Sequence, residues 1–267
     1  MRENYKMGLE QIKNEDFEGA ISVFNEIISK DSTIYEVYQS RGYCYFKTGS
    51  YENAINDYQI AFSSNYNPQL LFNLGMCYVK LERFDLALGS FNQFELKDSL
   101  NKDLWLQKAL CLSQLKEYSI ALDYYNKAES YFSDSIKLLK NIGVCHFQLS
   151  NHYSTIDVLK TYLDSIKDDQ SIYEMIAFSY HELGAFDKAK SYFDQMTELG
   201  MEMEEKTQTL YNSNLLKLGE KQYNKKSFIA ALQSFTKVIE LDPENKEAYF
   251  NRGLVQLYYE KRKDQSS

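Results

Sequence analysis

The residues of this 267-residue chain that could do chemistry include four cysteines. Cys44, Cys77, Cys111 and Cys145 follow one another at steps of 33, 34 and 34 residues. The sequence holds no C-x-x-C pair, so the spacing does not suit a zinc site or a redox dithiol. The constant step instead places all four thiols at one position of a repeated unit, where cysteine acts as a small buried side chain. Neighbouring units hold such positions too far apart for a disulfide. Four free thiols favour a reducing compartment and predict a cytoplasmic location.

The three histidines predict no catalytic site. His146 and His152 stand alone, whereas the run His181-Glu-Leu-Gly-Ala185 begins like a zinc-protease helix. Its second histidine is replaced by Ala185, and Gly184 would break the helix, so the match fails. No glycine-rich phosphate loop, nucleophile elbow or carboxylate pair stands out from the repeat pattern. We therefore expect no enzymatic activity, no cofactor and no metal site.

The elements that position these residues repeat at about 34 residues. Glycines mark the first part of most units, at Gly8, Gly42, Gly75, Gly143, Gly219 and Gly253. Alanines mark the second part, at Ala20, Ala54, Ala87, Ala121, Ala189 and Ala231. An aromatic residue follows each alanine by four residues, at Phe24, Tyr58, Phe91, Tyr125, Phe193 and Phe235. The chain is therefore a stack of one repeated unit.

Each unit is predicted to be a helical hairpin. Tyr38, Arg41 and Gly42 recur at the spacing of one helical face, and Ala20 and Phe24 repeat that spacing in a second segment. Short breaks such as 47–50 and 183–185 contain a glycine that can end a helix with positive φ. The small residues let the paired helices approach closely, and the aromatic residue fills space between neighbouring hairpins. One hairpin cannot bury this face alone, so the units must stack.

The pattern resembles the tetratricopeptide repeat family over almost the whole chain. The fourth unit supplies Trp105, Leu112, Ala121, Tyr125 and Ala128, and the seventh closes with Leu241-Asp-Pro-Glu-Asn245. The fifth unit departs from it, with Thr155 and Leu159 in place of the alanine and the aromatic residue. The resemblance implies an all-α fold, a right-handed α-solenoid of about seven helix-turn-helix repeats followed by a single final helix.

A single domain over residues 1–267 is expected, with one irregular junction. The predicted repeats span about 1–33, 34–67, 68–100, 101–134, 135–168, 169–201 and 207–244, and the final helix spans 245–262. The step between the last two alanines is 42 residues, so eight residues are extra between Gly200 and Leu210. This segment lacks proline and is rich in helix formers, which predicts a first helix about two turns longer in the seventh unit, after Gly200 ends the preceding helix. A hinge is the alternative.

Charge argues against nucleic acid as a partner, and hydropathy argues against insertion into a membrane. The chain has 30 basic and 38 acidic residues, a net charge of −8, which is the wrong sign for nucleic acid. No run of eighteen apolar residues is present and the first six residues form no signal core, so we expect a soluble, non-exported protein without membrane insertion.

The resemblance also implies a partner-binding surface. In the tetratricopeptide family the first helix of each repeat lines a concave groove, at four positions counted from the glycine. These positions hold Tyr5, Leu9, Lys13, Gln39, Tyr43, Lys47, Phe72, Met76, Lys80, Leu106, Leu110, Lys140, Val144, Glu174, Phe178, Glu182, Leu216 and Glu220. Lysines lie in the amino-terminal half and glutamates in the other half; the alternative is that the lysines only solvate the edge. The carboxylate clamp of chaperone-tail receptors is not reproduced, since Val144 replaces the asparagine that should accompany Lys140.

The sequence thus predicts a non-catalytic scaffold or adaptor that binds a peptide or helix of a partner protein in its concave groove. Two alternatives stay open: the repeat portion of a larger enzyme or signalling protein, and a sensor of a peptide or small ligand. The final helix keeps Phe250, Leu254, Leu257 and Tyr258 apolar, where a terminal cap should be polar. This face is a second candidate for docking or self-association.

Overall fold

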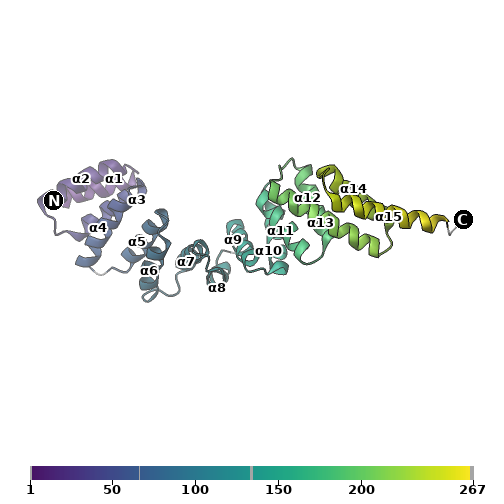
Figure 1. Cartoon of the computed structure of the whole chain (residues 1–267). Coiled ribbons are helices and arrows are strands. Elements are labelled where there is room, and N and C mark those ends of the chain that lie inside the picture. Colours follow the sequence, from purple (N-terminus) through teal and green to yellow (C-terminus); the bar gives the residue numbers. More distant parts are fainter. Residues whose placement is uncertain (1, 66, 133–134, 265–267) are drawn as a thin grey trace. The chain divides into compact units, whose positions relative to one another are not determined.

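The computed structural model describes residues 2–65, 67–132 and 135–264, and every regular element within them is an α-helix. The helices form seven hairpins and a final single helix (Figure 1), as the sequence predicts. In chain order they are α1 (Arg2–Lys13), α2 (Phe17–Lys30), α3 (Tyr35–Lys47), α4 (Tyr51–Ser64), α5 (Gln69–Lys80), α6 (Phe84–Glu95), α7 (Lys102–Gln114), α8 (Tyr118–Glu129), α9 (Ile136–Gln148), α10 (His152–Ser165), α11 (Gln170–Glu182), α12 (Phe186–Glu198), α13 (Glu205–Asn224), α14 (Phe228–Leu241) and α15 (Lys246–Asp264).

The chain divides into two compact units between the fourth and fifth hairpins. The first unit is Met1–Ser133 and contains α1 to α8; the second is Asp134–Ser267 and contains α9 to α15. Within each unit the second helix of one hairpin packs against the first helix of the next, as α2 does against α3 and α10 against α11. Each unit therefore has a continuous core of stacked hairpins.

The glycine, alanine and aromatic positions form the contact inside each hairpin. Ala20, Ala54 and Ala87 are fully buried, and the Phe24 ring lies directly over Gly8, where an added Cβ would come 2.5 Å from Cε1. The ring also shares a buried cluster with Val37 of α3. The aromatic residue therefore packs inside its own hairpin and also fills the space toward the next hairpin. The sequence predicted only the second of these contacts. Leu159 takes the same place over Gly143 in the divergent fifth repeat.

The four cysteines occupy equivalent places in the core. Their exposed fractions are 0% for Cys44, Cys77 and Cys111 and 1% for Cys145, and all four are free thiols. Burial raises the thiol pKa of Cys44 to about 11 and the pKa values of Cys77 and Cys111 to about 12. These three thiols therefore stay protonated, and all four cysteines are packed as expected of small core side chains.

The turn inside each hairpin always contains one residue with positive φ. Only two of these residues are glycines, Gly49 and Gly184, as the sequence suggested. The others are Glu15, Glu82, Lys116, Ser150 and Lys226, with φ between 57° and 65°. They recur at the repeat spacing, so the hairpin geometry imposes this conformation on residues that do not favour it.

The irregular junction before the seventh hairpin is a longer helix, as predicted. Helix α12 ends at Glu198, Gly200 has φ of +72°, and α13 has 20 residues where the other first helices have 12 or 13. Helix α13 starts only at Glu205, after six non-helical residues, 199–204. In its added turns, Tyr211 stacks on Phe193 with ring centroids 4.8 Å apart.

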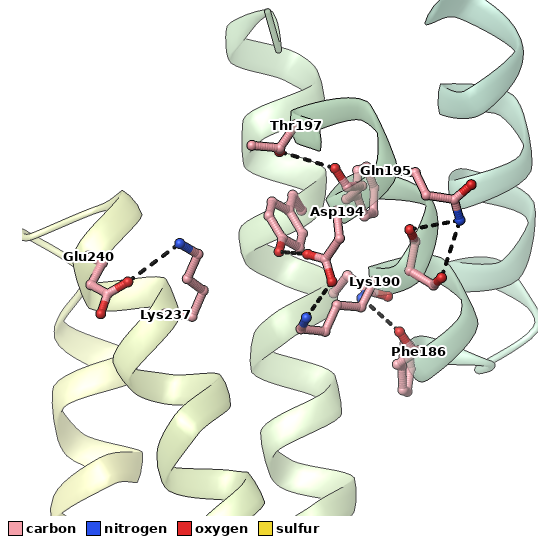
Figure 2. A network of polar contacts seen from close by, with 11 residues as sticks. Phe186, Lys190, Asp194, Gln195, Thr197, Lys237 and Glu240 are labelled. Carbon is pink, nitrogen blue, oxygen red and sulfur yellow. Dashed lines mark hydrogen bonds and ion pairs between the residues drawn. The ribbon is translucent and has the colours of Figure 1, made fainter. Parts of the chain in front are cut away.

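The stacked Tyr211 is also held by a polar contact to α12. Its hydroxyl donates to Asp194 at 2.6 Å, and Asp194 also pairs with Lys190 one turn away on the same helix (Figure 2). Burial, followed by the bond to Asp194, raises the pKa of the Tyr211 hydroxyl far above its usual value. The lengthened helix is thus fixed to the preceding repeat by both stacking and hydrogen bonding.

Candidate partner-binding surface

Several first helices of successive repeats contact one another within a unit. In the first unit α1 contacts α3, where the Tyr5 hydroxyl and Ser40 Oγ are 3.0 Å apart, and α5 contacts α7. In the second unit α13 contacts both α11 and α15. Side chains at the predicted groove positions of one unit can therefore form a shared surface.

In the first unit, part of this surface is open to solvent. Leu9 is 41% exposed and Tyr43 is 39% exposed, although both are large apolar side chains. The Tyr43 ring meets the edge of the Phe17 ring, at 6.2 Å between centroids, and Lys47 Nζ lies 5.5 Å from the Tyr43 ring centroid. Exposed apolar side chains beside cations are suited to a peptide that carries both apolar and acidic groups.

Lysines stand at the carboxyl ends of three first helices of this unit. Lys13, Lys47 and Lys80 are all exposed at the ends of α1, α3 and α5. Among residues 2–65, 67–132 and 135–264, no carboxylate forms an ion pair with Lys13, Lys47 or Lys80. The three cations are thus available to an acidic ligand.

Other predicted groove residues belong partly to the core. Phe72 packs against Phe91 and Phe94 at centroid distances of 5.6 and 5.5 Å, and Met76 lies against the same buried cluster. Tyr5 packs on the Phe24 ring at 5.9 Å. The Phe72 ring thus packs on α6 of its own hairpin, and this predicted groove position belongs partly to the core. Leu106 and Leu110 are half-buried on α7.

Two cations of the first unit, one partly buried and one buried, did not appear among the predicted site residues. Arg41 donates from Nε and Nη2 to the two oxygens of Asp57, at 2.8 and 2.7 Å, and from Nη1 to Asn25 at 2.6 Å. Its guanidinium also lies 5.4 Å from the centroid of the Tyr38 ring. The hydrogen bonds to Asp57 raise the pKa of Arg41, and burial raises that of Asp57. This pair clamps α3 to α4.

The second cation, Lys108 of α7, is buried, and its side chain is 5% exposed. Its Nζ donates to Glu95 Oε2 at 2.6 Å and to the Tyr124 hydroxyl at 2.7 Å. Arg41 directly precedes Gly42, and Lys108 directly precedes Ala109, which holds the glycine position of its repeat. That shared register was the available sequence signal for both clamps.

In the second unit the predicted groove residues are mostly engaged within the chain. Lys140 donates to Asp169 Oδ2 at 2.7 Å, and the Tyr162 hydroxyl donates to the same oxygen at 2.9 Å. Phe178 packs against Phe147 and His152, with ring centroids 5.4 and 6.0 Å away. Lys140 is thus part of a network inside the chain.

The remaining predicted residues of this unit differ in exposure. Glu174 accepts from Gln170 at 3.0 Å and Glu220 pairs with Lys217 at 3.2 Å, whereas Glu182 is exposed. Val144 is half-buried and Leu216 is buried.

The predicted face of the final helix is also largely open. Phe250 is 67% exposed, and Leu257 and Tyr258 are each 51% exposed. Leu254 is less exposed and lines a cavity of about 170 Å³ that is bordered by α13, α14 and α15. The Tyr258 ring lies 5.9 Å from that of Tyr223. Helix α15 therefore leaves apolar area uncovered along the described part of the chain.

Within the residues that the structure describes, no group of three or more histidine, cysteine, aspartate or glutamate side chains could hold a metal ion. None of the helices in the described part of the chain is both long and apolar enough to span a membrane.

Comparisons with solved structures place the fold among tetratricopeptide repeat proteins. A tetratricopeptide repeat protein from Parabacteroides merdae ATCC 43184 is 15% identical and superposes with a TM-score of 0.57, covering 96% of this chain and 98% of its own. The C-terminal part of such a protein from Cytophaga hutchinsonii is 18% identical with a TM-score of 0.59, covering 92% of this chain and 98% of its own. YrrB, described as having an unusual peptide-binding site, is 19% identical with a TM-score of 0.57 over 63% of this chain and 88% of its own.

A search of curated proteins finds no significant match. Two family models, both described as tetratricopeptide repeat, match the sequence itself, the first over residues 5–68, 41–94 and 72–135 and the second over residues 170–199. Such repeats generally form non-catalytic scaffolds for protein interactions. Because the matched segments make up more than half of the sequence and the helical hairpins agree with them, the chain belongs to the tetratricopeptide repeat family.

Proposed function

We propose that the chain is a non-catalytic adaptor that binds an acidic, partly apolar peptide or helix of a partner protein on the first helices of its amino-terminal unit. The observation that carries this proposal is the exposure of Leu9 and Tyr43 on helices that end in Lys13 and Lys47, with Lys80 exposed at the end of the next first helix. The peptide's carboxylates would meet the lysines, and its apolar side chains would rest on Tyr43 and Leu9. The peptide-binding site named for YrrB supports this type of ligand in a protein of the same fold.

The amino-terminal unit is the better candidate because its cations are free to bind. Lys140, the predicted groove lysine of the second unit, is paired with Asp169. An incoming carboxylate would have to compete with that ion pair, whereas at Lys13 and Lys80 it would replace only water. The four buried free thiols support a reducing, cytoplasmic setting for the adaptor.

The proposal is tested with a displayed library of random peptides selected on the full chain. We expect the selected peptides to combine acidic and apolar residues. A variant with Lys13, Lys47 and Lys80 changed to glutamate should bind them with slower association and altered salt dependence, because edge charges steer the encounter. A matched variant with the exposed Lys6, Lys30 and Lys160 changed to glutamate has the same net charge and should bind like the native chain.

The apolar contribution is tested with Tyr43→Ala. Loss of an aromatic anchor should speed dissociation and weaken binding by about 2 kcal/mol, while circular dichroism shows unchanged helicity because Tyr43 is 39% exposed. Phe72→Ala is unsuitable, since it would also remove core packing. Selected peptides that bind both variants with native rates would show that this surface is not the binding site.

A further inference from the structure

The final helix repeats the sequence of an earlier first helix around its glycine. Helix α3 contains Tyr38-x-x-Arg41-Gly42, and α15 contains Tyr249-x-x-Arg252-Gly253. In each helix the arginine guanidinium carbon lies 5.4 Å from the centroid of the tyrosine ring. Helix α15 therefore presents the same surface as the first helix of a repeat.

That surface is covered on α3 and uncovered on α15. Tyr38 is 7% exposed, and a Cβ atom on Gly42 would come 3.0 Å from the Tyr58 ring of α4. Tyr249 is 46% exposed, and a Cβ atom on Gly253 would meet nothing within 4 Å. In the part of the chain that the structure describes, α15 thus has no second helix over its glycine.

The covered glycines of the chain show what fits such a position. Five of them lie against a side chain from the second helix of their own hairpin, at Gly8, Gly42, Gly75, Gly143 and Gly219. Four of these side chains are aromatic and one is Leu159. The aromatic side chain follows a buried alanine by four residues, as Tyr58 follows Ala54. A helix that covers Gly253 should therefore carry an alanine and, four residues later, an aromatic residue.

The cation before the glycine adds a charge requirement. Arg41 bonds to Asp57, and Lys108 bonds to the Tyr124 hydroxyl. Asp57 and Tyr124 hold the same place on the second helix, three residues after Ala54 and Ala121. Arg252 is the third cation in this register, and no carboxylate of the described residues forms an ion pair with it. A carboxylate at that place would receive two parallel hydrogen bonds from Arg252.

We propose that Tyr249, Arg252, Gly253, Gln256 and Leu257 form a docking site, here called the Gly253 face, for one amphipathic helix of a partner protein. The partner helix carries the pattern Ala-x-x-Asp-Tyr or Ala-x-x-Asp-Phe. Its aromatic ring lies on Gly253, its aspartate binds Arg252, and it packs on α15 as α4 packs on α3. This site shares no residue with the surface of Lys13, Lys47 and Lys80, so it stands independently of the function proposed above.

The proposal is tested with a synthetic peptide of residues 50–65, which contains Ala54, Asp57 and Tyr58 in the required pattern. A hydrocarbon staple between positions 56 and 60, both exposed on α4, holds the peptide helical. Its binding to the full chain is followed by fluorescence anisotropy. We expect saturable binding, and we expect Gly253→Leu and Arg252→Ala each to weaken it at least about tenfold, the loss that follows from about 1.4 kcal/mol.

Gly253→Leu places a side chain where the ring should lie, while the space around Gly253 is empty, so the variant should keep its helicity. Gly89→Leu on α6 is the matched control, because Gly89 is also an exposed helical glycine with open space around it, and it should bind like the native chain. A peptide with Asp57→Asn should bind the native chain more weakly and should show little further loss with Arg252→Ala, because the two changes remove one interaction.

The proposal is wrong if the stapled peptide binds the Gly253→Leu variant as tightly as the native chain. It is also wrong if the peptide does not bind the native chain. Sedimentation velocity without peptide provides a separate check. If the native chain forms a dimer and Gly253→Leu dissociates it, a second copy of the chain occupies the Gly253 face, and the proposed partner helix is wrong. The chain with Lys13, Lys47 and Lys80 changed to glutamate should still bind the stapled peptide. Failure of the Gly253 face is thereby distinguished from failure of the amino-terminal surface.

Discussion

Gly75 on α5 lies so close to the fully buried Phe91 on α6 that a Cβ atom on Gly75 would overlap the ring. We expect Gly75→Ala to destabilise the chain by about 1–2 kcal/mol, because overpacking outweighs the gain in helix propensity. Urea unfolding followed by circular dichroism measures this. Gly89→Ala in the same hairpin is the control, since nothing lies within 4 Å of Gly89, and it should stabilise by about 0.5–1 kcal/mol. Equal effects of the two changes would contradict the close approach.

Removal of Glu95 should expose the cost of burying Lys108. The Lys108 side chain is 5% exposed and Glu95 is its ion-pair partner at 2.6 Å. We expect Glu95→Ala to lower the free energy of unfolding by about 3 kcal/mol, because a buried ammonium group loses its counter-ion. Glu52→Ala, which breaks the exposed pair with Arg83, should cost less than about 1 kcal/mol. The same urea titration measures both, and a small loss in both variants would show that Lys108 is adequately solvated without Glu95.

The contribution of Asp169 should depend on pH. Burial raises the pKa of this carboxyl group, but hydrogen bonds from Lys140, Ser171 and Tyr162 outweigh burial, and the net pKa lies below the usual 3.8. A carboxyl group whose pKa is lowered in the folded state stabilises the fold at pH values above its pKa in the unfolded chain. This stabilisation is lost as the pH falls through the pKa of the folded state. Asp169→Asn should therefore destabilise the chain at about pH 7 and make less difference at about pH 3.

Urea unfolding at the two pH values tests this dependence, with Asp168→Asn, an exposed neighbour, as the control that should change little at either pH. A loss of stability in Asp169→Asn that is the same at both pH values would assign the effect to packing instead of charge.

Two substitutions at positive-φ turn positions should change the stability in opposite directions, because one introduces a glycine and the other removes one. Glu82 has φ of 57°, and Glu82→Gly should stabilise by about 0.5–1 kcal/mol because glycine adopts this conformation without steric cost. Gly49 has φ of 81°, and Gly49→Ala should destabilise by about 1 kcal/mol. Thermal unfolding of the two variants measures both shifts. A lower melting temperature for Glu82→Gly would show that the side chain makes a favourable contact that offsets its strain.

Regular spacing made most of the fold predictable. The glycine and alanine positions gave the hairpins, and even the extra turns of α13 followed from eight inserted residues without turn chemistry. The positive φ at Glu82 and Lys116 was not apparent from residue type, because neither residue favours that conformation. It follows from register, since these residues hold the place that Gly49 holds in its own repeat.

The candidate site was less predictable, because exposure and pairing depend on neighbouring side chains. Lys47 and Lys140 both hold predicted groove positions, five residues after and three residues before the repeat glycine. Lys140 is paired with an aspartate of the next hairpin, Asp169, at 2.7 Å, whereas Lys47 has no ion pair among the described residues. Phe72 holds a groove position in the sequence pattern, but its ring packs on Phe91 and Phe94 in the core. A position in the repeat determines the direction of a side chain, and the adjacent residues decide whether the side chain remains free.

The four equivalent cysteines can report where the chain opens locally. Each lies in a different hairpin, from the second to the fifth, and each is at most 1% exposed. An alkylating reagent reaches a thiol only after its hairpin has separated from a neighbour, and repeat proteins open in such local steps. The order in which the four thiols react would therefore chart, hairpin by hairpin, where the stack first comes apart and how far the opening spreads, without any label being introduced.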